Sequence, residues 1–306
     1  MKALVTTEDS GFGLRMADVP EPEPRPGQAL VEVRAVAVNR GELSMMAMLP
    51  PGSQLGWDIA GTVLRPAADG SGPAAGTRVT GLADGAGWSE LAAADTARLT
   101  PVPDDLDWTA ATAIPVVGLT ALYALRHAGL LLGRTVLVTG AGGGVGRMAV
   151  QLAAASGARV VAWVGSAERA KGLRELGAAA VSTYDAEETG PVDVLVDSVG
   201  GQVLNRAYRL VVPGGKVIVY GNTTRSELNL PVDWGHARPG VQLRYVHLFH
   251  ELPAHPVTRD LGFLVQRVAD GLLDPQVATV APWTDAEPAL RALAQRQVNG
   301  KVVLTI

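Results

Sequence analysis

The sequence predicts an α/β protein in which a doubly wound parallel sheet is joined to a smaller β-rich domain. Three observations predict this fold class. Short apolar segments separated by turns fill the first hundred residues, strands and helices alternate from Arg134 onward, and the chain ends in a strand-like segment. Alternation of strand and helix is typical of a parallel sheet covered by helices on both faces.

Composition limits the classes of protein. The 306 residues are 47% hydrophobic and 18% charged, which suits one large or two ordinary globular domains. The net charge of −4 gives no general attraction for nucleic acid or an anionic membrane. The start, MKALVTTEDSG, lacks the pattern of a signal peptide, so we expect a cytoplasmic protein. The absence of cysteine excludes disulfides, thiolate nucleophiles and cysteine-based zinc sites.

The first part of the chain reads as strands followed by a helix. Alternating apolar and polar residues in ALVEVRAVAV predict a half-buried strand over Ala29–Val38. Asp107 to Arg126 is predicted to be helical, with Asp107 or Thr109 as the cap and Pro115 as a kink or break. Further short strands are predicted at Lys2–Thr6, Ile59–Leu64, Arg78–Gly81 and Trp88–Ala93.

The later part of the chain is predicted to be a series of αβ units. From Thr135 the chain reads in turn as a strand, a loop, a helix and a second strand, in the segments TVLVTG, AGGGVG, RMAVQLAAASG and ARVVAWVG. Apolar strands are predicted at Val192–Val196 and Lys216–Tyr220, helices at Leu261–Leu272 and Ala286–Gln297, and a strand that rejoins the first domain at Lys301–Ile306.

The glycine-rich segment VLVTGAGGGVG, Val136 to Gly146, predicts a dinucleotide site of the Rossmann type. Ala141, Gly143 and Gly146 occupy the three positions of the G-x-G-x-x-G pattern, with Gly144 and Val145 between them. The helix that begins here directs its partial positive charge at a phosphate. A glycine-rich turn without function is the alternative, which the strand–loop–helix–strand context disfavours.

The end of the next strand discriminates between nicotinamide cofactors. NAD sites place an acidic residue there to bind the ribose 2′-hydroxyl. Ala162 to Ser166 contains no acid, whereas Ser166 and Arg169 offer a donor and a cation to a 2′-phosphate. We therefore predict NADPH. The alternative is that Ser166 only caps a helix starting at Ala167 and that Arg169 is solvated.

Several further segments, in order along the chain, resemble one family. These are the "VN" turn within Pro20–Leu43, LGWDIAGTV at Leu55–Val63, IPVVGLTALYAL at Ile114–Leu125, DSVGG at Asp197–Gly201, GGKVIVYGN at Gly214–Asn222 and NGKVVLTI at Asn299–Ile306. With the glycine loop between them, they are similar to the zinc-independent medium-chain dehydrogenase/reductases, in the branch of quinone oxidoreductases (zeta-crystallin-like) and enoyl reductases.

This resemblance implies a domain plan and a set of residues. Residues 1–113 would form a GroES-like catalytic domain, 114–252 a Rossmann domain, and 253–306 a return that completes the catalytic domain. The protein would be a homodimer formed through the edge of the Rossmann sheet, at Gln242 to Phe249. The residues implied near the cofactor are Asn39, Thr120, Tyr184, Ser198, Val199, Tyr220, Gly221, Asn222 and Asn299.

The resemblance also has departures. Zinc-dependent relatives carry a cysteine after the "VN" turn and a histidine in a "G-H-E" triplet, where this chain has Arg40-Gly41 and Gly56-Trp57-Asp58. We therefore expect no metal. Many enoyl reductases carry a tyrosine just beyond the "VN" turn as proton donor, and residues 40–47 contain none. The proton would have to come from elsewhere.

The predicted chemistry is hydride transfer to a quinone or to the C=C bond of an α,β-unsaturated carbonyl compound. Asn39 is expected to hydrogen-bond near the developing enolate oxygen, with Thr120 positioning the nicotinamide. The alternative is a redox-silent protein that binds NADPH. The residues expected at the substrate cleft are Trp57, Trp88, His247 and His250.

Two further interpretations stay open. His247 and His250, three residues apart, suit a metal site on a helix, contact with substrate, or simple packing. Asp58 suits either acid–base chemistry or a carboxylate bonded to backbone amides at a strand end.

Overall fold

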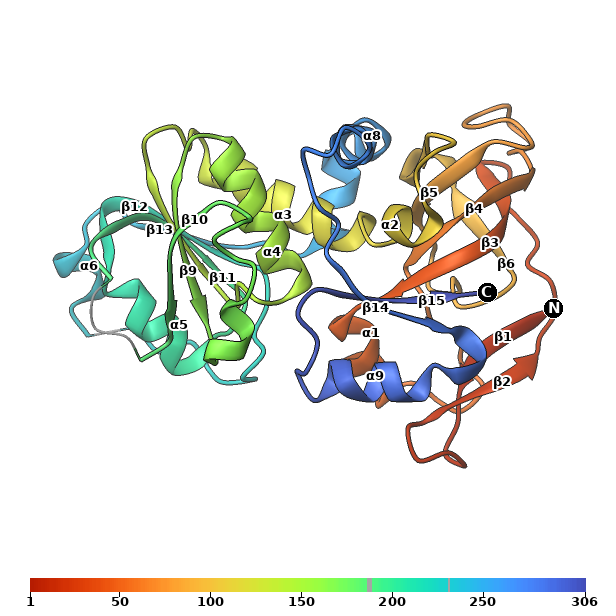
Figure 1. Cartoon of the computed structure of the whole chain (residues 1–306), viewed down its shortest axis with the longest axis horizontal. Helices are drawn as coiled ribbons and strands as arrows, with labels where there is room; N and C mark the ends of the chain where they lie inside the picture. The colour runs from red at the N-terminus through yellow and green to blue at the C-terminus, as the bar shows by residue number, and fades with distance from the viewer. Residues whose placement is uncertain (186–188, 231) are drawn as a thin grey trace. The chain divides into compact units, whose positions relative to one another are not determined.

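The computed structural model of the chain describes residues 1–185, 189–230 and 232–306. The chain divides into two compact units, which we treat separately. Unit 1 combines Met1–Leu119 with His255–Ile306, and unit 2 is Thr120–Ala254. Unit 2 is therefore inserted into the sequence of unit 1. The order of the elements can be followed in Figure 1.

Unit 1 contains a seven-stranded sheet in the order β14-β15-β3-β4-β5-β7, with β6 paired to β3. All pairs are antiparallel except β14 with β15. The strands are β3 (Gln28–Val38), β4 (Asp58–Arg65), β5 (Arg78–Leu82), β6 (Leu91–Asp95), β7 (Leu99–Pro101), β14 (Val277–Pro282) and β15 (Lys301–Thr305). The strand β15 pairs with β3 in antiparallel register.

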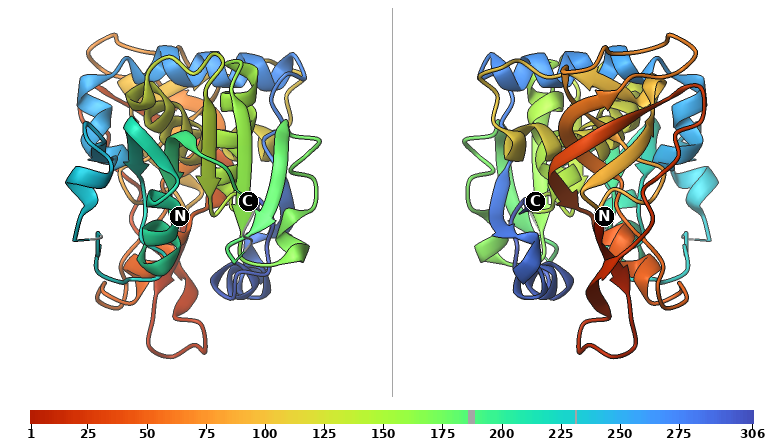
Figure 2. Two further views of the ribbon diagram at one scale, coloured as in Figure 1. Left: turned by 90° about the vertical axis from the view of Figure 1, so that its left-hand side faces the viewer. Right: turned by 90° about the vertical axis from the view of Figure 1, so that its right-hand side faces the viewer.

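A separate antiparallel hairpin is formed by β1 (Lys2–Thr6) and β2 (Leu14–Asp18). The red loop between these two strands projects from unit 1 in both views of Figure 2. The helices of unit 1 are α1 (Arg40–Met46), α2 (Trp108–Thr112), α8 (Val257–Ala269) and α9 (Glu287–Ala294). Short 3-10 helices lie at Thr96–Arg98 and Trp283–Asp285.

The predicted helix over 107–126 is two helices. Asp107 is the N-cap of α2, and its carboxylate accepts a hydrogen bond from the Thr109 amide at 2.7 Å. The helix ends at Thr112, and α3 (Pro115–Ala128) begins at Pro115. Proline is well suited to the first position of a helix because it has no N–H to leave unpaired. The predicted break at Pro115 is confirmed.

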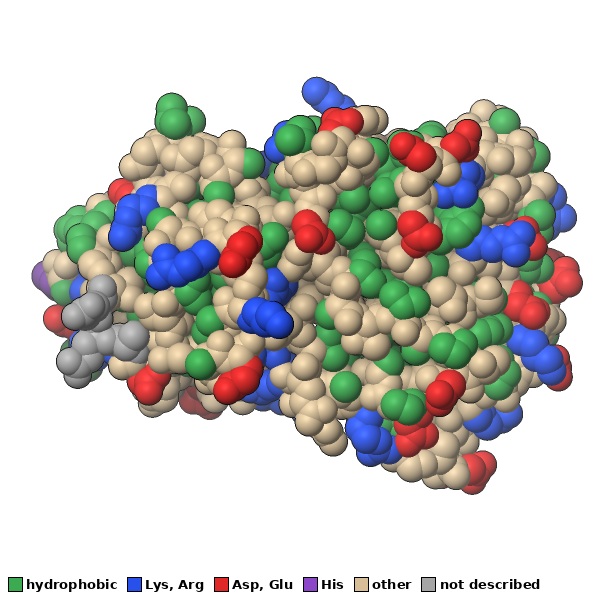
Figure 3. All heavy atoms as spheres, viewed as in Figure 1, with side chains coloured by type: hydrophobic (Ala, Val, Ile, Leu, Met, Phe, Trp, Pro, Cys, Tyr) green, Lys and Arg blue, Asp and Glu red, His purple; other side chains and the backbone are tan. Residues whose placement is uncertain are grey.

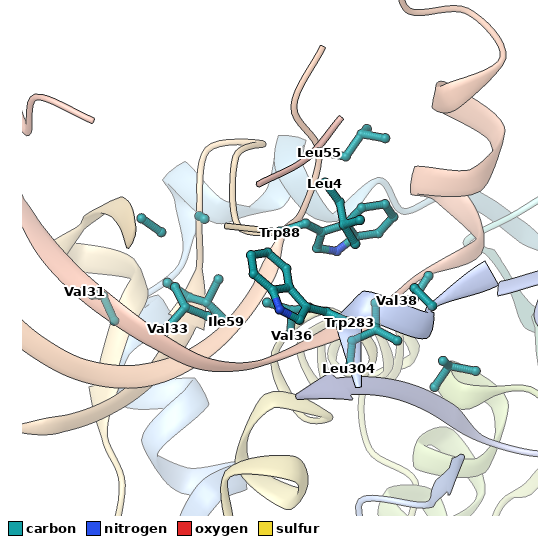
Figure 4. Packing of buried hydrophobic residues seen from close by; sticks show 14 of the residues in the cluster. Leu4, Val31, Val33, Val36, Val38, Leu55, Ile59, Trp88, Trp283 and Leu304 are labelled. Atoms are coloured by element: carbon teal, nitrogen blue, oxygen red, sulfur yellow. The ribbon is translucent and has the colours of Figure 1, made fainter. Parts of the chain in front are cut away.

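The core of unit 1 explains one difference from the predicted strands. Trp88 was expected to begin a strand, but β6 starts three residues later, at Leu91. The side chain of Trp88 is 1% exposed and packs with Leu4, Leu55 and Trp283 (Figure 4). The loop at Trp88 thus delivers a large aromatic ring into the core rather than continuing the sheet.

Unit 2 is built on a six-stranded sheet in the order β10-β9-β8-β11-β12-β13, in which every pair is parallel. This is the 3-2-1-4-5-6 order of a doubly wound dinucleotide-binding fold. The predicted fold class is confirmed. The strands are β8 (Thr135–Thr139), β9 (Arg159–Val164), β10 (Ala178–Thr183), β11 (Val192–Asp197), β12 (Val211–Val219) and β13 (Gln242–Tyr245).

The sequence of β8, TVLVT, shows why this sheet is parallel and central. Its last four residues are all buried, as expected of a strand covered on both faces. The helices of unit 2 are α4 (Gly144–Ala155), α5 (Gly201–Tyr208), α6 (Trp234–Ala237) and α7 (Leu248–Glu251), and α3 runs into the unit from its boundary. Short 3-10 helices lie at Ala167–Ala170 and Leu252–Ala254.

Basic, acidic and hydrophobic side chains are interspersed over the face shown in Figure 3. Among the described residues, none of the helices has both the length and the apolar character required to cross a lipid bilayer.

Candidate functional site

The glycine loop joins β8 to α4 in a turn that excludes side chains. A Cβ on Gly146 would lie 2.4 Å from the carbonyl oxygen of Gly140, so the helix can approach the strand only with glycine there. Gly140 has a φ of +62°, which favours glycine, and its missing side chain leaves room for Ser198. Gly143 is the N-cap of α4, and Gly144 and Val145 lie half-exposed in its first turn. The loop thus presents backbone at a helix N-terminus, which is how proteins hold a pyrophosphate.

The carboxyl end of β9 lies beside this loop. A Cβ on Gly142 would come within 3.2 Å of the Arg169 side chain, so Arg169 lies against the loop. The ring of Tyr184, which follows β10, lies against Gly165. Ser166 precedes the 3-10 helix but its side chain does not cap it. Instead it hydrogen-bonds Glu168, which lowers the pKa of that exposed carboxyl. Ser166 and Arg169 thus lie at the carboxyl end of β9, with Tyr184 against Gly165 and the acidic Glu168 bonded to Ser166.

Asp197 fixes the loop that follows β11. Its carboxylate accepts hydrogen bonds from the amides of Val199 (3.1 Å) and Gly200 (2.9 Å) and from the Thr139 hydroxyl at the end of β8. Burial raises the pKa of Asp197. A glycine, Gly221, allows the end of β12 to approach Ser198, because a Cβ there would lie 3.2 Å from the Ser198 carbonyl oxygen.

Tyr220 and Asn222 complete this edge of unit 2. The hydroxyl of Tyr220 is buried beside Ser198, and burial raises its pKa. Asn222 donates to the Ser226 carbonyl at 2.7 Å, and its amide oxygen lies against Gly200. Ligands of doubly wound folds bind outside the carboxyl ends of the strands, at the point where the strand order reverses. Here that point lies between β8 and β11, where the glycine loop and Ser198 meet.

Unit 1 contains a buried polar network around Asn39. The ammonium group of Lys301 donates to Asp58 (2.9 Å), to the Asn39 amide oxygen (2.7 Å) and to the Val38 carbonyl (3.3 Å). The Asn39 amide nitrogen donates to Asp58 at 2.8 Å and to Glu42 at 3.2 Å. Lys301, Asp58 and Glu42 are at most 2% exposed. We call these four residues, Asn39, Glu42, Asp58 and Lys301, the buried network.

The buried network changes the role expected for Asn39. An asparagine amide has two hydrogens to donate, and both are engaged by the carboxyl groups of Asp58 and Glu42. Its oxygen is engaged by Lys301. Asn39 therefore has no amide hydrogen left for an enolate oxygen unless the network opens, and we do not retain it as the polarising group. Its position fixes the start of α1.

The structure also decides between the two interpretations of Asp58. One carboxylate oxygen accepts a hydrogen bond from the Val116 amide at 2.8 Å, and the other receives Asn39 and Lys301. Asp58 is thus the strand-end carboxylate bonded to a backbone amide, with a buried lysine as its counter-ion. Its 0% exposure leaves it no access to a reacting molecule.

Glu42 is the second carboxyl group of the network. It accepts from the backbone amides of Asn39 and Trp57, both at 2.7 Å. Burial, followed by the charge of Asp58, raises the pKa of Glu42 to about 8. A proton on Glu42 leaves Asp58 and Lys301 as opposed charges, so that the network is neutral near pH 7. Buried charges are tolerated when they are paired in this way.

The remaining predicted residues are dispersed. Thr120 is buried in α3, and Asn299 is half-buried just before β15. Trp57 is partly exposed beside α1, whereas Trp88 is enclosed in the core of unit 1 and cannot line a cleft. His247 and His250 are exposed; His247 is the N-cap of α7, and its ring lies 6.0 Å from that of Phe249.

Sequence reasoning missed Glu42 and Lys301. A signal for Glu42 was present, because Asn followed three residues later by Glu is the pattern of a helix capping box. Lys301 was harder to recognise, since only its position inside the apolar run KVVLTI sets it apart from a surface lysine.

Two protein-family models match the chain. The alcohol dehydrogenase GroES-like domain matches residues 25–104, and the zinc-binding dehydrogenase model matches residues 144–243. Among solved structures, a mycobacterial protein complexed with NADPH is 26% identical with a TM-score of 0.89, and each chain is covered completely. The quinone oxidoreductase of Escherichia coli, also complexed with NADPH, is 23% identical with a TM-score of 0.89, which shows the fold alone; each chain is again covered completely.

Curated relatives include parts of much longer polyketide synthases. The spectinabilin polyketide synthase system protein NorB of Streptomyces orinoci is 35% identical over 92% of this chain and 13% of the relative. Erythronolide synthase EryA2 of Saccharopolyspora erythraea is 36% identical over 94% of this chain and 8% of the relative. The chain therefore spans a small part of the length of these relatives.

Proposed function

Because the chain belongs to the zinc-independent medium-chain dehydrogenase/reductase family, we propose that it is an NADPH-dependent reductase of quinones or of the C=C bond of α,β-unsaturated carbonyl compounds. The observation that carries this proposal is the carboxyl edge of the unit 2 sheet. There the glycine loop meets Ser198 at the reversal of the strand order, Arg169 lies against the loop, and Tyr184 lies against Gly165 at the end of β9.

The residues at this edge fit a dinucleotide. Glycine at Gly146 lets α4 begin close to the end of β8, and the first turn of α4 offers backbone N–H groups to the pyrophosphate. Arg169 and Ser166 would hold the 2′-phosphate, with Tyr184 beside it. When bound, NADPH supplies the hydride. The loops after β11 and β12, held by Asp197, would orient the nicotinamide through Ser198, Val199, Gly221 and Asn222.

The two kinds of relative point to different acceptors. The structural relatives include a mycobacterial quinone oxidoreductase at 26% identity, whereas parts of polyketide synthases are 35% and 36% identical. The higher identity favours an unsaturated carbonyl acceptor in secondary metabolism. A panel containing enals, enones and quinones, followed by the loss of NADPH absorbance near 340 nm, tests both.

Cofactor choice is the sharpest test of the site. Arg169→Ala removes a charge-assisted hydrogen bond and is expected to weaken NADPH binding about 10- to 150-fold while NADH binding stays unchanged. Arg159→Ala is the matched control, because Arg159 is exposed at the opposite end of β9. Glu168→Gln is expected to tighten NADPH by removing an acid beside Ser166. Equal loss of both cofactors in Arg169→Ala would contradict the proposal.

A redox-silent NADPH-binding protein is the second candidate. The observation that favours it is the full engagement of the Asn39 amide, together with the absence of tyrosine from residues 40–47. Tight NADPH binding without turnover of any acceptor in the panel would select this function over the first.

We also propose a homodimer formed through β13. This strand is at the edge of the unit 2 sheet, and all four of its residues are exposed, including Leu243 and Tyr245. An exposed strand edge is a template for pairing with another strand, and a second copy related by a two-fold axis would continue the sheet.

A further inference from the structure

Gly142 lies in the glycine loop at a position where neither the sequence pattern nor the backbone requires glycine. It stands between Ala141 and Gly143, at a variable position of the G-x-G-x-x-G pattern, and its φ lies outside the left-handed region. An added Cβ would nevertheless lie 2.9 Å from the carbonyl oxygen of Arg169, 3.1 Å from its Cβ and 3.2 Å from its Nε. The close packing of Arg169 on the loop therefore accounts for glycine at this position.

The neighbouring Gly143 has different surroundings. A Cβ there would meet the carbonyl oxygen of Gly140 at 3.4 Å, which is an ordinary contact. Gly143 is half-exposed, whereas Gly142 is buried. The two adjacent glycines therefore have separate roles. Gly143 leaves the backbone open at the N-terminus of α4, and Gly142 lets the backbone and side chain of Arg169 rest against the loop.

The helix α4 contacts the same segment of chain a few residues further on. Arg147, which is 4% exposed, donates from Nη2 to the carbonyl of Lys171 at 2.5 Å. Lys171 directly follows the 3-10 helix Ala167–Ala170, which carries Arg169. The spacing between the glycine loop and Arg169 is thus fixed by packing at Gly142 and by a hydrogen bond from α4.

This spacing matters for a cofactor that is held at two phosphates. In NADPH the pyrophosphate and the 2′-phosphate are attached to the same ribose, so the groups that bind them must be a fixed distance apart. NADH carries only the pyrophosphate. Charge-assisted hydrogen bonds are strong but depend on distance and angle. A shift of Arg169 away from the loop would therefore weaken NADPH binding and leave NADH binding unchanged.

We propose that Gly142 is a specificity-determining residue for NADPH over NADH, because it positions Arg169 relative to the glycine loop, with Arg147 as a second positioning residue. This inference rests on the proposed function, in which Arg169 holds the 2′-phosphate. It assigns cofactor selectivity to a loop position that the dinucleotide pattern leaves unspecified.

The test is the dissociation constant of each cofactor, measured by titration calorimetry without an acceptor. Gly142→Ala places a Cβ against a backbone carbonyl, so the 3-10 helix must move. We expect NADPH binding to weaken about 3- to 30-fold, a partial loss of the Arg169 contact, and NADH binding to stay unchanged. Gly235→Ala in α6 is the matched control, because a Cβ there would meet nothing within 4 Å among the described residues. It should bind both cofactors as the wild type does.

Two further variants separate positioning from a general defect. Gly142→Ala added to Arg169→Ala should weaken NADPH no further than Arg169→Ala alone, because both act on one guanidinium group. Arg147→Met removes the hydrogen bond to Lys171 and should also weaken NADPH selectively. A loop that is merely damaged would lose affinity for both cofactors.

The outcomes distinguish this inference from the proposed function. Suppose that Arg169→Ala loses NADPH selectively but Gly142→Ala keeps the wild-type ratio of the two constants, or weakens both cofactors equally. The positioning role would then be overturned while the proposed function stands. If Gly142→Ala does not fold, unchanged selectivity in Arg147→Met overturns the inference by itself. Equal affinity of the wild type for NADPH and NADH overturns the proposed cofactor, and this inference with it.

Discussion

Replacing Lys301 by methionine tests whether the buried network holds unit 1 together. The substitution keeps the length of the side chain and removes its charge and its three hydrogen bonds. It leaves the Asp58 carboxylate, which is 0% exposed, without its counter-ion. Removing one partner of a buried ion pair costs about 3–5 kcal/mol of folding free energy, because the other charge stays buried and unpaired.

A matched surface pair provides the comparison. The Lys2 ammonium and the Asp18 carboxylate are 2.8 Å apart, against 2.9 Å in the buried pair, but their side chains are 50% and 78% exposed. Lys2→Met is expected to cost less than about 1 kcal/mol, because exposed ion pairs are screened by water and salt. A loss of about 3–5 kcal/mol in unit 1 corresponds to a fall in melting temperature of about 6–20 °C. The two substitutions therefore differ by more than the error of a standard unfolding experiment.

The assay is urea unfolding followed by tryptophan fluorescence, to which Trp88 and Trp283 in the core of unit 1 contribute. The double variant Asp58→Asn with Lys301→Met is expected to lose less than the sum of the single variants, because it leaves no charge unpaired. A loss in Lys301→Met no larger than that in Lys2→Met would refute the reasoning. It would mean that the network opens to water at little cost.

Two further predictions concern Glu42 and β13. The pKa of Glu42 in the folded protein is about 8, against 4.5 as its ordinary value, so the folded state holds a proton that the unfolded state releases. The contribution of Glu42 to the free energy of unfolding is full below about pH 4.5 and is lost as the pH rises through 8. The urea concentration at half-unfolding should therefore fall from pH 5 to 7 to 9 in the wild type, and should vary less in Glu42→Gln. For the dimer, Leu243→Lys is expected to convert the dimer seen in sedimentation to a 31.7 kDa monomer. The control Leu228→Lys, which changes another exposed leucine, should leave the dimer intact. A wild type that sediments as a monomer would contradict the proposed interface.

Local sequence patterns predicted those helices, strands and turns whose structure is determined by neighbouring residues. The run TVLVT and the glycine loop identified β8 and the start of α4, since a buried parallel strand and a tight turn each restrict nearby residues. Asp107 and Pro115 marked helix ends for the same reason. The strand β14, VATVAP, was missed although its burial alternates, because its residues are small and weakly patterned.

The buried network shows why the rest was inaccessible. Lys301 meets Asp58 across 243 positions of sequence and Asn39 across 262, and no local pattern indicates such partners. Asn39 was expected to hydrogen-bond an enolate oxygen, but its amide hydrogens and oxygen are engaged by residues that only the fold brings near. The prediction that Trp88 lies at the substrate cleft was wrong for a similar reason, because its core partners Leu4 and Trp283 lie at opposite ends of the chain.

The central place of β15 in the sheet has a consequence for synthesis on the ribosome. β15 lies between β3 and β14 and pairs with Ala35–Val38 of β3, so this part of β3 stays unpaired on that side until Lys301–Thr305 emerge. At about 5–20 residues per second, Lys301 follows Asn39 by roughly 13–50 s. Unit 2, which is continuous in sequence, can complete its sheet during that interval. During that interval the nascent chain carries an unpaired part of β3 and an Asp58 without its lysine, which leaves this segment of β3 exposed to mispairing.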